Sequence, residues 1–151
     1  MDSSQPAFLY SDGGRQASGF KGEARDCVTR AIAIVTGLPY SEVYEALAMG
    51  NASQRPKKSK KKPAKSARNG IDTKKPWFKR YMQSLGFEWV PTMRIGQGCS
   101  VHLSPDELPS GKLVLSLSKH YTAMIDGVLH DTHDCSREGQ RCVYGYWRYQ
   151  H

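Results

Sequence analysis

The sequence predicts an α+β domain in which N-terminal helices pack on an antiparallel β-sheet formed by the C-terminal half. In the first 86 residues, apolar side chains recur at spacings of three and four, as they do on one face of a helix. Beyond this point the pattern changes to short alternating runs separated by Gly, Pro and Asp, which is typical of strands and turns. A length of 151 residues suits one domain, so we assign residues 1–151 to a single domain.

The first helix is expected in "DCVTRAIAIVTG". Asp26 is a favourable N-cap residue, and Gly37 suits the left-handed position that ends a helix. These limits place Cys27 in the first helical turn. A second helix, "EVYEALAM", should follow with Ser41 as its cap.

Residues 52–70 are predicted to form a basic insertion without regular structure. Apolar periodicity is absent there, and like charges repel one another. The segment holds eight Lys and Arg residues and no acidic residue between positions 55 and 68. Without these eight the chain has 22 − 8 = 14 basic and 14 acidic residues, so the net charge of +8 belongs to this segment. Clustered cations attract phosphates without sequence specificity. The candidate nucleic-acid-binding residues are Arg55, Lys57, Lys58, Lys60, Lys61, Lys62, Lys65 and Arg68.

A third helix and the strands follow the insertion. "KPWFKRYMQSLGF" has Pro76 where a first-turn proline is tolerated and Gly86 as its stop. The segments "FEWVPTM", "KLVLSLS" and "CVYGYWRY" are expected to be strands. Together with a hairpin at residues 119–133 they would complete the sheet.

The hairpin "KHYTAMIDGVLHDTH" carries the first candidate site residues. Asp126-Gly127 between two apolar runs predicts a two-residue type I′ turn. This turn sets Thr122 opposite Asp131 and makes His120 a diagonal neighbour of Asp131 on the same face. A carboxylate that accepts from one imidazole nitrogen leaves the other nitrogen free to act as a base.

Cys27 is the candidate nucleophile for that base. A thiol in the first turn of a helix lies at the positive end of the helix dipole, which favours thiolate. Taken alone, Cys27 would more simply be a small buried hydrophobe, because free cysteine is among the most buried residue types. The hairpin with His120 and Asp131 makes catalysis the favoured hypothesis, since the sequence then supplies a nucleophile, a base and an orienting group together.

The blocks "DCVTRAIAIVTGLPYSEVYEAL", "HYTAMIDGVLHDTHD" and "VYGYW" resemble the papain-like cysteine peptidase fold, and most closely a group of small phage and prophage proteins with that fold. The resemblance covers most of residues 20 to 149 apart from the insertion. It implies a peptidase, isopeptidase or amidase that acts on a protein or peptide without a cofactor. It implies that Cys27 is the nucleophile, His120 the general base and acid, and Asp131 the orienting group.

The oxyanion site departs from the family pattern. The backbone N–H of Cys27 would supply one donor. Papain-like enzymes usually place Gln six residues before the cysteine, where this chain has Lys21. Gln16 or Lys21 is therefore the candidate for the second donor, and without either the fold would have lost catalysis.

Other readings of the hairpin region remain open. His133 lies opposite His120 and is a rival to Asp131, as is Asp134 if the strand contains a bulge. A zinc site is disfavoured because alternation sends His130 and His133 to opposite faces, and no metal is expected. Its candidate ligands would be His130, His133, Cys135 and Cys142.

A cytosolic chain is expected, in the host cell if it is phage-encoded, because neither a signal peptide nor a membrane-spanning stretch is present. The four cysteines are then expected to be thiols, although Cys135 and Cys142 could pair under oxidation. The alternative function is a non-catalytic papain-fold protein that binds nucleic acid or an acidic partner through the insertion.

Overall fold

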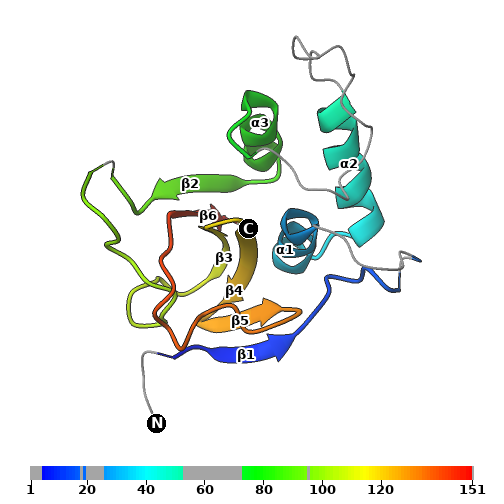
Figure 1. The fold of residues 1–151 in the computed structure, drawn as a ribbon. Helices are drawn as coiled ribbons and strands as arrows, with labels where there is room; N and C mark the ends of the chain where they lie inside the picture. Colours follow the sequence, from blue (N-terminus) through cyan, green and yellow to red (C-terminus); the bar gives the residue numbers. More distant parts are fainter. Residues whose placement is uncertain (1–4, 18, 20–25, 53–72, 95, 151) are drawn as a thin grey trace.

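The computed structural model describes residues 5–17, 19, 26–52, 73–94 and 96–150. Within them the chain forms three helices and a six-stranded mixed sheet, which confirms the α+β class (Figure 1). The elements are β1 (Ala7–Tyr10), α1 (Cys27–Thr36), α2 (Tyr40–Ala52), α3 (Pro76–Ser84), β2 (Phe87–Pro91), β3 (Lys112–Leu117), β4 (His120–Ile125), β5 (Val128–Asp131) and β6 (Gly145–Tyr149). No helix among the described residues is long and apolar enough to cross a membrane.

The sheet has the order β1-β5-β4-β3-β6-β2 and is not purely antiparallel. β1 pairs with β5 in parallel, so the expectation of an antiparallel sheet made by the C-terminal half is wrong at this edge. The four residues of β1 are all exposed. A strand with no buried face carries no alternation, which is why the apolar pattern did not indicate it.

The β4–β5 hairpin has the predicted register. Asp126 and Gly127 have φ angles of 49° and 81°, as both central residues of a type I′ turn require. Ala123 pairs with His130, and the turn holds the two strands in the alignment expected from the sequence. This register places the first residue of β4 near the last residue of β5.

Two apolar clusters cover the two faces of the sheet. One lies between the sheet and the helices, where α1 packs against the concave side of the curved sheet (Figure 1). Alternation along β3 divides its side chains between the clusters, with Val114 facing the helices while Leu113 and Leu115 face the other cluster. α1 is therefore held on β4 by a continuous core.

The limits of α1 and α2 follow from their end residues. Gly37 adopts the predicted left-handed conformation and its N–H donates to the Ala33 carbonyl. Asp26 stands at the N-cap position but makes no side-chain capping bond within the described residues. Ser41 is not the cap of α2, because the helix already begins at Tyr40 and Ser41 lies inside it. The Pro39 carbonyl accepts from the N–H groups of Glu42 and Val43.

Cys99 and Cys142 form a disulfide, so the expectation of four free thiols is wrong for this pair. A β-bridge between His102 and Cys142 brings the two segments together. The Cα atoms of Cys99 and Cys142 lie 5.9 Å apart, a separation that a disulfide can span. The pairing of Cys142 with Cys135 does not occur, and Cys135 is a buried free thiol.

Two substitutions on α2 test the helix side of the core. Leu47→Ala removes a fully buried side chain and should lower the free energy of unfolding by about 2–5 kcal/mol in urea titrations. Met49→Ala is the matched control because Met49 is 57 % exposed, and it should cost less than about 0.5 kcal/mol. Equal costs would contradict the packing of α2 described above.

Candidate active site

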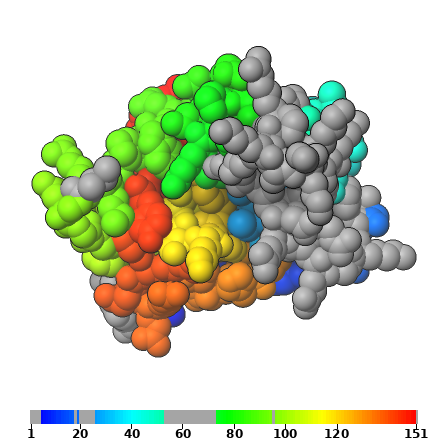
Figure 2. All heavy atoms as spheres, turned by 45° about the horizontal axis from the view of Figure 1, so that its top comes forward, coloured from blue at the N-terminus to red at the C-terminus, as the bar shows by residue number. Residues whose placement is uncertain are grey.

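Cys27 is the first residue of α1, and its sulfur meets the start of β4. The backbone N–H of Tyr121 donates to the Cys27 Sγ at 3.4 Å, across a sequence separation of 94 residues. Atoms in the blue of α1 reach the surface beside yellow atoms from the part of the chain that holds β3 and β4 (Figure 2). Cys27 is partly buried, so the sulfur lies where the core meets the solvent.

His120, the neighbour of Tyr121, is bound to Asp131. The His120 Nε2 lies 2.7 Å from the Asp131 Oδ2, and the side chain of Asp131 is only 3 % exposed. Thr122 Oγ1 donates to the same oxygen at 2.7 Å, and the Thr132 N–H donates to Oδ1 at 2.7 Å. The carboxylate is therefore held from several directions, and its orientation fixes that of the imidazole.

Cys27 and His120 also influence each other's pKa. Because Nε2 faces Asp131, Nδ1 is the ring nitrogen left for the sulfur. Burial raises the pKa of the Cys27 thiol, but the hydrogen bond and the positive charge of His120 outweigh it, and the pKa falls below its ordinary value. Burial by itself lowers the pKa of His120, while its hydrogen bonds, that to Asp131 foremost, raise it to about 11.

Asp131 carries the negative charge that pairs with the protonated His120. Burial tends to raise its pKa, but the hydrogen bonds from His120 and Thr122 and the charge of His120 lower it to about 2. Imidazolium with a carboxylate on one side and thiolate on the other is the charge pattern of an activated cysteine nucleophile. As the first residue of a helix, Cys27 also has a backbone N–H without an intrahelical acceptor. That N–H is suited to bind an oxyanion.

Of the two predicted second oxyanion donors, only Gln16 lies among the described residues, and no contact of its side chain with the sulfur is found there. Gln16 is exposed, and the contacts described for it involve its backbone, whose N–H donates to the Asp12 Oδ2 at 3.0 Å. Lys21 lies outside the described residues. The eight basic residues of segment 55–68 also lie outside them.

The rivals of Asp131 take other places. His133 is exposed, and its ring centroid lies 5.2 Å from that of His120. Asp134 is exposed as well and accepts a hydrogen bond from the Ser136 N–H at 3.0 Å. Among the contacts of the described residues, the carboxylate bound to His120 is that of Asp131.

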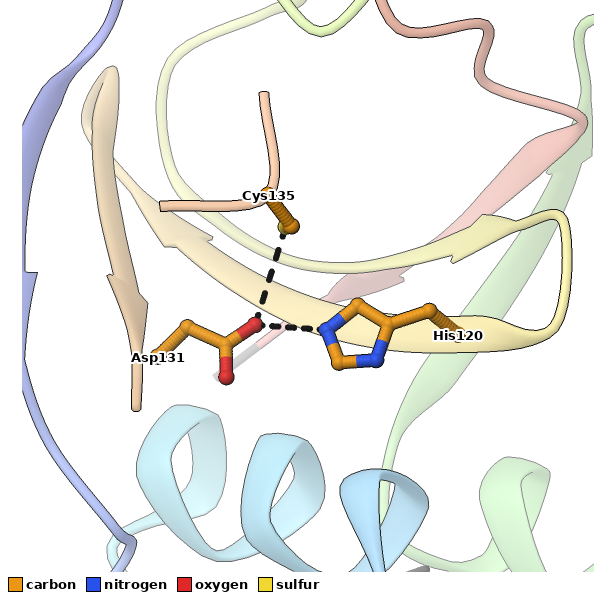
Figure 3. Close-up of side chains that lie close together, drawn as sticks. All are labelled: His120, Asp131 and Cys135. Atoms are coloured by element: carbon orange, nitrogen blue, oxygen red, sulfur yellow. Dashed lines mark hydrogen bonds and ion pairs between the residues drawn. The ribbon is translucent and has the colours of Figure 1, made fainter. Parts of the chain in front are cut away.

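The predicted zinc ligands do not come together, because Cys142 is held in the disulfide with Cys99. A different group does: the ligand atoms of His120, Asp131 and Cys135 all lie within 4.8 Å of one another. Figure 3 shows an oxygen of Asp131 between the imidazole and the thiol. Cys135 lies beyond the end of β5, where strand alternation no longer applies, so the sequence pattern could not place it.

A second buried carboxylate, Asp26, stands directly before Cys27 in the sequence. It is 2 % exposed, and it contacts Arg30, Tyr40 and the Nε of Arg15, the last at 3.1 Å. Arg30 also reaches towards Asp131, with its Nη2 3.8 Å from Oδ1, and its charge helps to lower the pKa of Cys27. Sequence reasoning missed Arg30, although its spacing of four from Asp26 is that of a helical ion pair.

Removal of the Asp26 charge tests this cluster. Asp26→Asn leaves two guanidinium groups beside a neutral amide, and we expect a loss of about 3 kcal/mol in the free energy of unfolding, measured by urea titration. Glu88→Gln is the matched control, because Glu88 pairs with Arg148 at the surface and should change stability by less than about 1 kcal/mol. A loss no greater than that of the control would show that the cluster does not stabilise the fold.

The sequence matches no protein-family model, and no curated protein or solved structure matches it. The function must therefore be argued from the geometry above. That geometry joins a thiol, an imidazole and a carboxylate drawn from α1, β4 and β5.

Proposed function

We propose that this protein is a cysteine-dependent acyl-transfer enzyme with a papain-like fold, most simply a peptidase, isopeptidase or amidase of phage or prophage origin. One observation carries the proposal. The Cys27 sulfur accepts from the backbone of Tyr121, while the adjacent His120 is bound to the buried carboxylate of Asp131. Folding thus places a thiol at a helix start next to an imidazole that is bound to a buried carboxylate, which is the set of groups that thiol catalysis needs.

In the proposed reaction, the Cys27 thiolate attacks the carbonyl carbon of an amide. The backbone N–H of Cys27 donates to the oxyanion that forms. His120 gives its Nδ1 proton to the leaving amine, the C–N bond breaks, and a thioester remains on Cys27. His120 then takes a proton from water as the water attacks the thioester, which releases the acid and restores the thiolate and imidazolium pair.

Asp131 acts through His120 and does not need to touch the substrate. Its Oδ2 holds Nε2 at 2.7 Å, which directs Nδ1 to the sulfur and stabilises the imidazolium. Thr122 and Thr132 in turn fix the carboxylate. If an amine replaces water in the second step, the same groups catalyse transfer instead of hydrolysis.

Alkylation of Cys27 tests the nucleophile without knowledge of the substrate. The lowered pKa of Cys27 predicts that iodoacetamide labels it at near-neutral pH faster than it labels glutathione, because more of the sulfur is thiolate. The rate should stay high as the pH falls below the ordinary thiol range, and His120→Ala should move the profile to higher pH. The site and the rate are read by mass spectrometry.

His130→Ala is the matched control for this experiment. His130 lies on the same hairpin and belongs to neither the thiol contact nor the carboxylate contact described above. The variant should keep the wild-type profile. Labelling of the wild-type protein that is no faster than labelling of glutathione would overturn the proposal.

Hydrolysis of p-nitrophenyl acetate tests Cys27, His120 and Asp131 together, because this activated ester acylates many nucleophilic enzymes and releases a coloured product. We expect a burst of nitrophenol as Cys27 is acylated, and no burst from Cys27→Ser. Asp131→Asn should slow deacylation on the order of 10²-fold, since the imidazole loses its orienting charge. Asp134→Asn is the exposed matched control and should leave both phases unchanged; equal effects of the two Asn variants would remove Asp131 from the mechanism.

A further inference from the structure

We infer that His120, Asp131 and Cys135 form a binding site for a thiophilic divalent cation of the zinc class, and that its occupation switches off the nucleophile. The three side chains offer a nitrogen, an oxygen and a sulfur within 4.8 Å of one another (Figure 3). Metal binding follows from this geometry alone. The switching effect rests in addition on the proposed function.

Cys135 is the residue that catalysis leaves unexplained. It is a free thiol, 4 % exposed, and its Sγ lies 3.7 Å from the Asp131 Oδ2. Cys27 already supplies the nucleophile of the proposed reaction, so a second thiol beside the carboxylate is not needed as a nucleophile. A soft sulfur, an imidazole and a carboxylate are together the ligand set that zinc prefers, and one that magnesium and calcium avoid.

The distances suit such an ion. Zinc bonds of about 2.0–2.3 Å in a tetrahedral arrangement separate neighbouring ligand atoms by roughly 3–4 Å. The Asp131 to Cys135 distance of 3.7 Å is already in this range, and the His120 to Asp131 distance of 2.7 Å would need to open slightly. The His120 to Cys135 separation is bounded at 4.8 Å, and the ion requires it to be no more than about 4 Å. Three protein ligands leave the fourth position to water, which can enter because the His120 side chain is 12 % exposed.

The surroundings would hold the ligands in place. Thr122 and the Thr132 N–H fix the two oxygens of Asp131, as outer-sphere partners do at metal sites. Cys135 precedes a tight turn in which the Arg141 N–H donates to the Ser136 carbonyl at 2.9 Å. The site is therefore largely formed before an ion arrives.

Occupation and catalysis exclude each other. Binding releases the Nε2 proton of His120 and the thiol proton of Cys135 to solvent, and the ion then bonds Nε2 in place of the Asp131 hydrogen bond. The remaining ring proton stays on Nδ1, so the imidazole can no longer accept a proton from water. The net charge of the site is unchanged, because the two positive charges of the ion replace two protons, but the positive charge moves from the ring to the ion beyond Nε2, farther from the sulfur, which weakens the stabilisation of thiolate at Cys27. The expected result is reversible inhibition.

Cobalt titration of the untagged Cys27→Ser chain tests the site without any enzymatic activity. The chain has four cysteines, and with Cys27 replaced and the Cys99 to Cys142 disulfide intact, Cys135 is the remaining thiol. A thiolate-to-cobalt charge-transfer band in the near ultraviolet is expected, and zinc should abolish it by displacement. Cys135→Ser in the same background should remove the band, whereas His130→Ala should retain it.

Absence of the band in Cys27→Ser, or its persistence in the Cys135→Ser double variant, would overturn the inference. Far-ultraviolet circular dichroism establishes that each variant is folded, and Cys135→Ala provides a second replacement of the thiol. A band with the expected dependence on Cys135 supports the site even if Cys27 proves unreactive. In that case the enzymatic proposal fails and the metal site stands.

Alkylation of the wild-type protein tests the switch. Zinc should slow the reaction of Cys27 with iodoacetamide, and removal of zinc with EDTA should restore it. Cys135→Ser should make the rate insensitive to the same zinc concentration. Equal slowing in wild type and Cys135→Ser would mean that zinc binds directly to Cys27, and would overturn the switch.

Discussion

The packing of α1 against β4 is the constraint on which the site depends. The helix presents one apolar face to the sheet, and its first residue then lies against the first residues of the strand. A rotation of α1 by one residue, about 100°, would expose part of that face and carry the Cys27 sulfur away from Tyr121. The apolar contacts that hold the helix on the sheet therefore also hold the Cys27 sulfur beside Tyr121.

Buried charges form the second level of organisation. Asp26 and Asp131 are each almost fully buried, and one guanidinium, that of Arg30, reaches both of them. Burying a carboxylate is costly unless it is paired and hydrogen-bonded, and both carboxylates have several partners. Arg30 thus connects Asp26, the residue before Cys27, with Asp131, the residue bound to His120, and its charge helps to lower the pKa of Cys27.

Asp131 belongs both to the proposed catalytic group and to the inferred metal site. The same oxygen contacts His120, Thr122 and the thiol of Cys135. In the proposed reaction, with a proton on Nε2, the oxygen orients His120 as a base for Cys27. In the inferred metal site, a cation takes the place of that proton and the oxygen is a ligand. The Asp131 carboxylate suits both the proposed catalytic state and the inferred metal-bound state, because each requires a fixed negative charge that faces the imidazole. Which state forms depends on whether a proton or a cation lies between Asp131 and His120.

The sequence by itself determined the elements with clear local signals. The periodicity of "DCVTRAIAIVTG" located α1 and its glycine stop, and the Asp126-Gly127 turn determined the register that makes His120 and Asp131 neighbours. Both depend on contacts between residues close in the chain, which leave a pattern in the order of the amino acids. The Cys27 contact was a hypothesis drawn from residue chemistry and resemblance.

Tertiary structure decided the parallel pairing of β1 with β5, the disulfide between Cys99 and Cys142, and the place of Cys135 beside Asp131. It also decided that Arg30 contacts two carboxylates. β1 buries neither face, and Cys135 follows a strand that has already ended, so neither shows a periodic signal. These features are contacts between segments that are distant in the sequence. Such contacts depend on the packing of every element between the two segments, so the local order of residues does not predict them.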